Sequence, residues 1–391
     1  MTLPRERKGH VLWPRVLAGA AMLLPLPAAA QQLMNSTLTL YGRSLSMSRL
    51  EQTRLLEVAH EIRSPNRAAQ DRTLAAAEAV ANTPDARYLL ATFQLEIGRQ
   101  RRDDALRRRA LEVLIPSGMT PADKLPGYLA IRGDIAFRAQ DYATAAADWG
   151  RLVELQPNDP QSLINLAQVR DAMNDPAGAA ALIQRAIAAQ GAGGTGPASE
   201  NTFRQRLSIT YNAGLGRESA EAAQALVAAY PTPENWRFAL VAYRQLAEPQ
   251  AGAEIDMLRL MRAVGALARA AEYRRLAQLL LHAGFAAEAR AVLDEGVSRR
   301  IDGMAQAPTP EIRQEIERTL ARALTRPAPS APDPSSAEGR YRLAAAEALA
   351  GRRAEAEAGF RALAESAPTD SGQAFYPDLA RFWLAWLARS G

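Results

Sequence analysis

The sequence predicts an all-α protein made of repeated helix pairs, and three observations lead to this prediction. Aromatic residues make up only 6% of the 391 residues, while alanine, leucine, arginine and glutamate are abundant, a composition that disfavours strands. A pattern of apolar residues recurs after 34 residues, and small residues recur within it where two helices would cross. The expected architecture is a right-handed α-solenoid of about seven to nine stacked helix–turn–helix repeats.

The first 30 residues are predicted to be a signal peptide. Basic residues between Arg5 and Arg15 precede an apolar run over 16–30, which ends in small residues before Gln31. A positive start, a short apolar middle and a small-residue end are typical of secretory signals, and cleavage is expected after Ala30. Retention as a membrane anchor is the alternative, which is disfavoured because a spanning helix needs about 20 apolar residues. The mature chain is therefore expected to be periplasmic or secreted, without a stable membrane span.

The charge and the missing cysteines exclude several classes of function. The whole chain has a formal net charge of +5, but four basic residues and one acidic residue fall in the first 30, which leaves 43 basic against 41 acidic residues. Such a nearly balanced chain gives no reason to expect a nucleic-acid partner. Without cysteine there can be no disulfide, no thiolate metal site and no lipoprotein acyl anchor.

The clearest repeats lie in the first half of the chain. The segment Gly133–Tyr142 is followed by Ala145 and Trp149, and 34 residues later Ala179 and Ile183 occupy the same places. The alanines let two helices approach closely, and the larger residues fill the gap beside them. This pattern resembles the tetratricopeptide repeat family, whose unit is a 34-residue helix–turn–helix.

The rest of the chain divides by helical periodicity and loop composition. Two positions depart from the family pattern, because Arg132 stands where leucine is usual and Gly191 stands where proline is usual. In chain order, the expected segments after the signal peptide (1–30) are an N-terminal helical hairpin (31–82), tetratricopeptide-like repeats (83–190), a Gly-rich loop (191–200), further repeats (201–325), a Pro-rich loop (326–338), one repeat (339–370) and a C-terminal capping helix (371–391).

Two roles are open to the C-terminal helix. It is the most aromatic stretch of the chain, and its apolar residues share one helical face, at positions 379, 382, 383, 386 and 387. As a cap it would cover the last repeat with this face. As a docking helix for a partner it would leave Trp383 or Trp386 exposed.

No motif predicts an enzyme. His60-Glu61 begins like a zinc-protease helix, but Ser64 stands where the second histidine ligand is required. After the signal peptide only His60 and His282 remain, far apart in sequence, and Lys124 is the single lysine. The sequence therefore predicts no catalytic residue, no cofactor and no metal site. A helical-solenoid hydrolase of glycans or peptidoglycan, using a pair of carboxylates, is kept as an alternative.

The resemblance implies where a partner would bind. In the tetratricopeptide family the first helix of each repeat lines a groove, and this groove usually binds an extended peptide or a helix of another protein. Asn165 matches an asparagine that bonds the ligand backbone in many family members, and its alternative role is ordinary packing at the helix surface. Mapped onto this sequence, the groove positions are Asp134, Phe137, Arg138, Asn165, Gln168, Asp171, Arg274, Gln278 and His282.

The resemblance also implies the kind of function. The leading hypothesis is a non-enzymatic scaffold of the bacterial cell envelope that binds a protein or peptide in the groove. The alternative is a component associated with export of a cellulose-like or other exopolysaccharide, since exported tetratricopeptide proteins of that kind exist. In that case aromatic groove residues such as Phe137 would contact a glycan.

Overall fold

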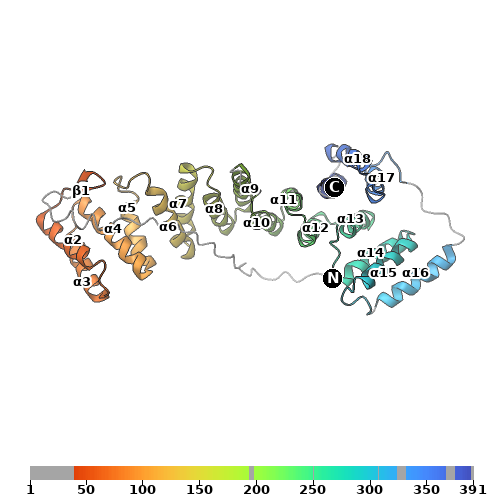
Figure 1. Ribbon diagram of the computed structural model, residues 1–391, viewed down its shortest axis with the longest axis horizontal. Coiled ribbons are helices and arrows are strands. Elements are labelled where there is room, and N and C mark those ends of the chain that lie inside the picture. The colour runs from red at the N-terminus through yellow and green to blue at the C-terminus, as the bar shows by residue number, and fades with distance from the viewer. Residues whose placement is uncertain are drawn as a thin grey trace. The chain divides into compact units, whose positions relative to one another are not determined.

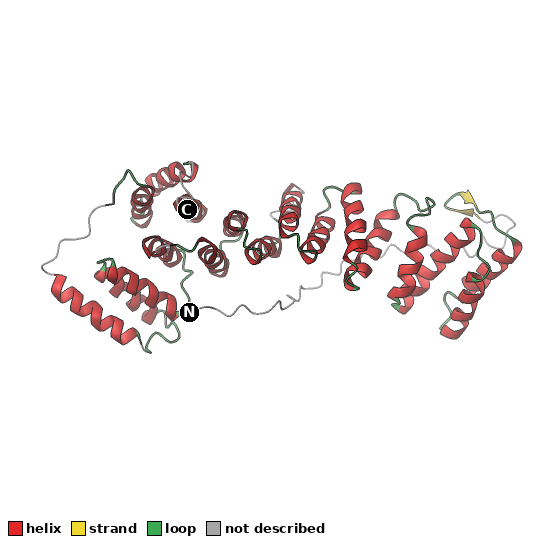
Figure 2. Cartoon of the chain, turned by 180° about the vertical axis from the view of Figure 1, so that it is seen from behind, coloured by secondary structure: helices red, strands yellow, loops and turns green. Residues whose placement is uncertain are grey.

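The computed structural model describes residues 39–192, 198–249, 251–306, 308–323, 332–366 and 375–388. Over these ranges the chain forms eighteen helices and one short two-stranded hairpin, and successive helices pack against each other in pairs (Figures 1 and 2). The predicted all-α fold of repeated helix pairs is thereby confirmed. The expected signal peptide, with its cleavage point between Ala30 and Gln31, lies outside the described residues.

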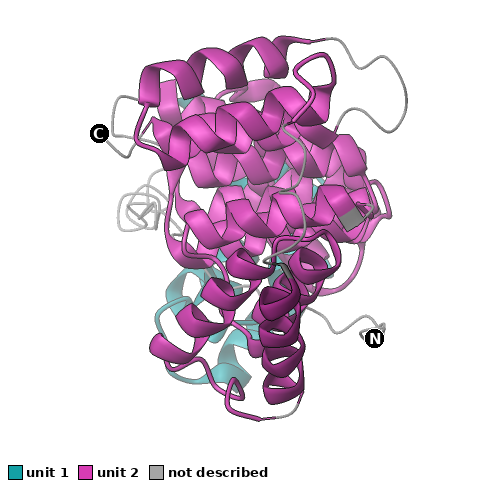
Figure 3. Ribbon diagram, turned by 90° about the vertical axis from the view of Figure 1, so that its right-hand side faces the viewer, with its two compact units in different colours: residues 1–128 teal, residues 129–391 magenta. Residues whose placement is uncertain are grey.

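The chain divides into two compact units, residues 1–128 and 129–391 (Figure 3). Helix α6 (Leu125–Arg138) crosses the boundary. The described elements before it, all in the first unit, are β1 (Thr39–Leu40), β2 (Arg43–Ser44), α2 (Arg49–Glu61), α3 (Arg67–Glu78), α4 (Pro84–Arg101) and α5 (Asp104–Leu114).

The β1–β2 hairpin is the one described element that the composition did not predict. Leu40 pairs with Arg43, so only Tyr41 and Gly42 form the turn. Both turn residues have positive φ, 52° and 78°. Two-residue hairpin turns of this handedness match the twist of the strands, and glycine adopts positive φ without steric cost. The turn therefore needs only two residues, and so short a segment does not alter the helix-rich composition from which the fold was predicted.

Glu51 ties the start of α2 to the start of α4. Its Oε2 accepts a hydrogen bond from the Ser48 amide at 2.6 Å, and its Oε1 accepts from the amides of Asn82 and Thr83 at 2.9 and 2.8 Å. Burial would raise the pKa of the Glu51 carboxyl, but the backbone donors outweigh it and lower this pKa to about 2. The ionised carboxylate thus joins segments more than thirty residues apart.

The second unit contains the larger part of the repeat array. Several helices begin at a side-chain cap: Asp141, Asp159 and Thr232 each accept a hydrogen bond from the amide three residues on. After α6, the described helices are α7 (Tyr142–Leu155), α8 (Pro160–Ala172), α9 (Pro176–Ala192), α10 (Glu200–Asn212), α11 (Gly216–Ala229), α12 (Pro233–Ala247), α13 (Ala251–Ala263), α14 (Ala270–His282), α15 (Ala286–Ser298), α16 (Thr309–Ala323), α17 (Ala337–Leu349), α18 (Arg353–Glu365) and α19 (Phe375–Leu387).

Small residues lie where helices cross, as the spacing predicts. Ala145 and Ala179 are fully buried, and Trp149 and Ile183 are buried beside them. At the crossing of α6 and α7 even a methyl group would not fit, because a Cβ on Gly133 would lie 2.7 Å from Trp149 Nε1. Close approach of the backbones is therefore part of each helix pair.

Arg132, which departs from the family pattern, has a defined partner. Its Nε and a terminal nitrogen donate to the two carboxylate oxygens of Asp148 at 2.8 and 2.6 Å. The Asp148 side chain is only 2% exposed. A bidentate ion pair between α6 and α7 thus stands where an apolar leucine contact would be usual.

The C-terminal helices fold back onto the middle of the second unit. Helix α19, expected to cap the last repeat, packs on α17 and α18 and also on α11 and α13. The ring of Phe382 lies 6.2 Å from that of Trp236 and 5.5 Å from that of Tyr243, between centroids. The Tyr243 hydroxyl donates to Asp378 Oδ2 at 3.1 Å. Residues from α10 to α19 therefore share one apolar core.

Candidate functional site

The first helices of successive pairs supply one candidate surface. In Figure 1, the first helices α10 and α12 lie on one side of the array, and α9 and α11, the second helices of the pairs α8–α9 and α10–α11, lie on the other. Contacts join α10 to α12 directly, and α12 to α14 through a bidentate ion pair between Arg237 and Glu272 at 2.7 Å. We call the half-buried and exposed side chains of α8, α10, α12 and α14 the first-helix face.

The three predicted residues of α6 differ in exposure. Asp134 is half-buried and Arg138 is exposed. The ring centroid of Phe137 lies 5.7 Å from those of both Tyr142 and Trp149. The aromatic ring of Phe137 is therefore engaged inside its own helix pair, where it fills space next to the crossing of α6 and α7.

The predicted residues of α8 lie on the first-helix face. Asn165 and Gln168 are half-buried, and Asn165 Oδ1 accepts a hydrogen bond from Gln161 Nε2 at 2.8 Å. Asp171 is exposed as a residue, yet neighbouring atoms desolvate its carboxyl and raise the pKa of that carboxyl. Asp171 forms no ion pair with another described side chain, so its carboxylate can accept hydrogen bonds from a ligand.

Of the predicted residues of α14, Arg274 and His282 contact backbone carbonyl groups of this chain. Arg274 donates from one terminal nitrogen to the Gly303 carbonyl and to Thr309 Oγ1, both at 3.2 Å, and so links α14 to the segment that leads into α16. Gln278 is half-buried. His282 is exposed, and its Nδ1 lies 2.7 Å from the Gln278 carbonyl oxygen.

Helices α10 and α12, which lie between α8 and α14 in the array, add four residues that the sequence mapping missed. The Arg204 guanidinium lies 5.9 Å from the ring centroid of Phe238, and the Tyr211 hydroxyl donates to Gln245 Oε1. Phe238 and Tyr211 are half-buried. Each pair spans 34 residues, the repeat period, so extending the groove mapping to these weaker repeats would have found them.

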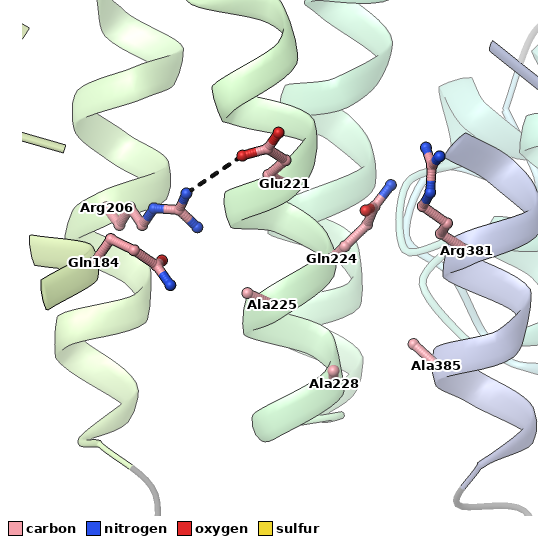
Figure 4. Close-up of a pocket in the computed structure, with 8 residues that line it drawn as sticks. All are labelled: Gln184, Arg206, Glu221, Gln224, Ala225, Ala228, Arg381 and Ala385. Atoms are coloured by element: carbon pink, nitrogen blue, oxygen red, sulfur yellow. Dashed lines mark ion pairs between the residues drawn. The ribbon is translucent and has the colours of Figure 1, made fainter. Parts of the chain in front are cut away.

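A second candidate surface lies on the other side of the second unit. It is an open cleft of about 570 Å³ with α11 as its floor, α9 and α10 on one side and α19 on the other (Figure 4). We call it the α11 cleft. Its lining residues are Gln184, Arg206, Glu221, Gln224, Ala225, Ala228, Arg381 and Ala385.

The α11 cleft was not predicted, because one of its walls exists only through the folding back of α19. Gln224 Nε2 donates weakly to the carbonyl and a carboxylate oxygen of Asp378, at 3.4 and 3.5 Å. Arg381 donates to the same carboxylate at 2.7 Å and to the Ala364 carbonyl at 2.8 Å. The contact of Gln224 joins α19 to α11, and that of Arg381 with Ala364 joins α19 to α18.

Two features, a cluster of metal ligands and a membrane-spanning helix, are absent from the described residues. Among them, no three histidine, aspartate or glutamate side chains gather as the ligands of a metal ion would. None of the described helices is both long and apolar enough to cross a membrane.

Nineteen chains of solved structures match this protein. No protein-family model and no curated protein matches this sequence. Among solved structures, the chain is similar to a tetratricopeptide repeat protein from Parabacteroides merdae, with a TM-score of 0.33 and 12% sequence identity, over 70% of this chain and 100% of the other. A functional proposal therefore rests on the residues of this chain.

Proposed function

We propose that this chain is a non-enzymatic scaffold that binds a partner protein or peptide through the first-helix face. The observation that carries the proposal is the pair of contacts between α10 and α12, Arg204 with Phe238 and Tyr211 with Gln245. Arginine and aromatic side chains are enriched at protein interfaces, where they contribute much of the binding energy. Here they lie at adjacent, partly exposed places on neighbouring helices.

An extended ligand suits the spacing of these side chains. Amide and hydroxyl groups recur on neighbouring first helices, at Asn165 and Gln168 of α8, Tyr211 of α10 and Gln245 of α12. Such groups can donate to and accept from the backbone of an extended peptide. Repeat arrays bind in this manner because each repeat adds similar surface next to its neighbour.

We place this scaffold in the bacterial cell envelope, in the periplasm or secreted. This part of the proposal depends on residues 1–30, whose basic start, apolar run and small residues before Gln31 are typical of an export signal. The glycan alternative would use aromatic groove residues such as Phe137, and the ring of Phe137 packs against Tyr142 and Trp149.

The test is recovery of a partner from an envelope extract with the tagged mature chain. Phe238→Ala should reduce recovery of a specific partner at least about tenfold, since it removes a ring at the centre of the face. Asn165→Ala should weaken it less. Val297→Ala, which shortens a 48% exposed apolar side chain on the second helix α15, is the matched control and should leave recovery unchanged. Equal effects of Phe238→Ala and Val297→Ala would contradict the assignment of the face.

A further inference from the structure

We propose that the α11 cleft is a separate binding site for a peptide with an acidic side chain. The guanidinium of Arg206 would bind the carboxylate of that side chain. The cleft lies on the side of α9 and α11, so this inference goes beyond the proposed role of the first-helix face and does not depend on it. Four features of the cleft carry it: burial of Arg206, its missing hydrogen bonds, a displaceable neighbour, and the lining beside it.

Arg206 is a buried cation without adequate partners. The residue is only 9% exposed, yet its guanidinium donates no hydrogen bond to another described residue, and its Nε is fully buried without a partner. The nearest acid is Glu221, 3.6 Å away. By contrast, Arg132 in the same unit makes two charge-assisted hydrogen bonds of 2.8 and 2.6 Å to Asp148. A guanidinium has five donors, and buried donors in folded proteins are nearly always satisfied.

The electrostatic balance supports the same conclusion. Burial lowers the pKa of Arg206, and the attraction of Glu221 and Glu218 does not restore it. The lowered pKa means that nearby acids and hydrogen-bond acceptors do not fully stabilise the charged guanidinium of Arg206. A carboxylate placed against the guanidinium in a bidentate arrangement would supply both the charge and the hydrogen bonds.

The neighbour of Arg206 can give way to a ligand. Figure 4 shows the guanidinium directed along the cleft toward Glu221, with Gln184 beside it. The Glu221 side chain is 54% exposed, so it can rotate into solvent when another carboxylate approaches. Gln184 and Gln224 also line the cleft, and their amide groups can form hydrogen bonds with a peptide backbone.

The lining favours a carboxylate over a phosphate. Glu221 lines the cleft 3.6 Å from Arg206, and the charge of Arg381 at the far wall is balanced by Asp378 at 2.7 Å, so a doubly charged phosphate would be repelled by Glu221 more strongly than a singly charged carboxylate. The methyl groups of Ala225, Ala228 and Ala385 line the rest of the cleft and can contact the methylene carbons of a glutamate side chain. A volume of about 570 Å³ holds a few residues of a peptide.

The test uses the full mature chain and two blocked pentapeptides, acetyl-Gly-Ala-Glu-Ala-Gly-amide and its glutamine counterpart. Binding is measured by calorimetry and by the side-chain NMR signals of isotope-labelled arginine. The glutamate peptide should bind at least about tenfold more tightly than the glutamine peptide, because only the former forms a charge-assisted pair. Arg206→Gln should abolish this preference. Arg290→Gln, on the second helix α15 with a 50% exposed side chain outside both candidate surfaces, is the matched control and should retain it.

A second variant keeps the test decisive if Arg206→Gln fails to fold. Glu221→Gln changes an exposed side chain and removes the competing acid, so it should tighten binding of the glutamate peptide several-fold. Equal binding of the two peptides by the wild-type chain, or no gain with Glu221→Gln, would overturn the proposal. Tighter binding of inorganic phosphate than of the glutamate peptide would also overturn it. Phe238→Ala, which tests the first-helix face, should bind the glutamate peptide normally, so the two proposals fail separately.

Discussion

Replacing Asp256 with alanine should loosen the contact of helices α17–α19 with α13. The Asp256 carboxylate is only 1% exposed and joins three helices. It accepts from Arg342 Nε at 2.9 and 3.2 Å, from the Tyr376 hydroxyl at 3.3 Å and from Arg259 at 3.4 Å. Arg342 belongs to α17 and Tyr376 to α19, so this one carboxylate contacts both of these C-terminal helices.

The size of the stability loss depends on which ion pairs Arg342 and Arg259 retain when Asp256 is removed. Removing one member of a buried ion pair costs about 3–5 kcal/mol when the other charge is left uncompensated. Here Arg342 keeps Glu338 at 2.5 Å, and Arg259 keeps Glu288 at 2.5 and 2.9 Å. Burial raises the pKa of Asp256, because desolvation disfavours the charged carboxylate. This penalty offsets part of the stabilisation that the ion pairs provide. We therefore expect a loss of about 2–3 kcal/mol, equivalent to roughly a 100-fold increase in local opening.

Hydrogen exchange of the backbone amides measures this opening helix by helix. Amides of α17 and α19 should exchange roughly 100-fold faster in Asp256→Ala, with little change in α8 and α9. Asp294→Ala is the matched control, because its side chain is 54% exposed and pairs with Arg313 on the surface; it should change exchange by less than about 0.5 kcal/mol. Unchanged exchange in α17 and α19, or an equal rise in α8, would refute the reasoning.

Three further predictions concern stability. Arg132→Leu should cost about 3–5 kcal/mol because it leaves Asp148 buried and unpaired, and adding Asp148→Leu should recover most of that loss, both measured by urea unfolding. Glu51 has a lowered pKa, so its contribution to stability is complete above about pH 4.5 and declines as the pH falls toward 2; Glu51→Gln should remove this part of the pH dependence. Gly133→Ala should cost about 1–3 kcal/mol in thermal unfolding, because its Cβ would overlap the Trp149 ring.

Each of these predictions has an outcome that contradicts it. If the double variant of Arg132 and Asp148 is no more stable than Arg132→Leu alone, the pair does not act as a unit. If Glu51→Gln follows the wild-type pH curve, its carboxylate is not the titrating group. Gly150→Ala, where no atom lies within 4 Å of the added Cβ, is the control for Gly133→Ala, and a loss of similar size there would show that packing against Trp149 is not the cause.

The helix pairs could be predicted from the sequence because the information for them is local. Buried Ala145 and Trp149 lie four residues apart on one helix, and the pattern returns one repeat later. The partner of Arg132 could not be predicted in this way, since a charged residue at a normally apolar position gives no indication of which acid will pair with it. Phe238 and Gln245 lie in repeats whose consensus residues are weaker, so their groove positions follow only when the 34-residue period is extended beyond the clear copies.

The α11 cleft was beyond sequence reasoning for a different reason. Its wall depends on contacts such as that of Gln224 with Asp378, which are 154 residues apart. No repeat period relates these positions. The packing of α19 depends on the shape of the surface offered by Trp236, Tyr243 and their neighbours, which exists only after the array has formed.

The folding back of α19 has a consequence for how this array unfolds. In a simple array each repeat contacts only its neighbours, so unfolding begins at an end and proceeds inward. The bond from Tyr243 to Asp378 and the packing of Phe382 on Trp236 connect the end of this chain to helices well inside it. The C-terminal helix cannot fray without exposing the core of α11–α13. Its amides should therefore be protected as strongly as those of the middle of the unit, and the region from α11 to α19 should unfold as a single cooperative block.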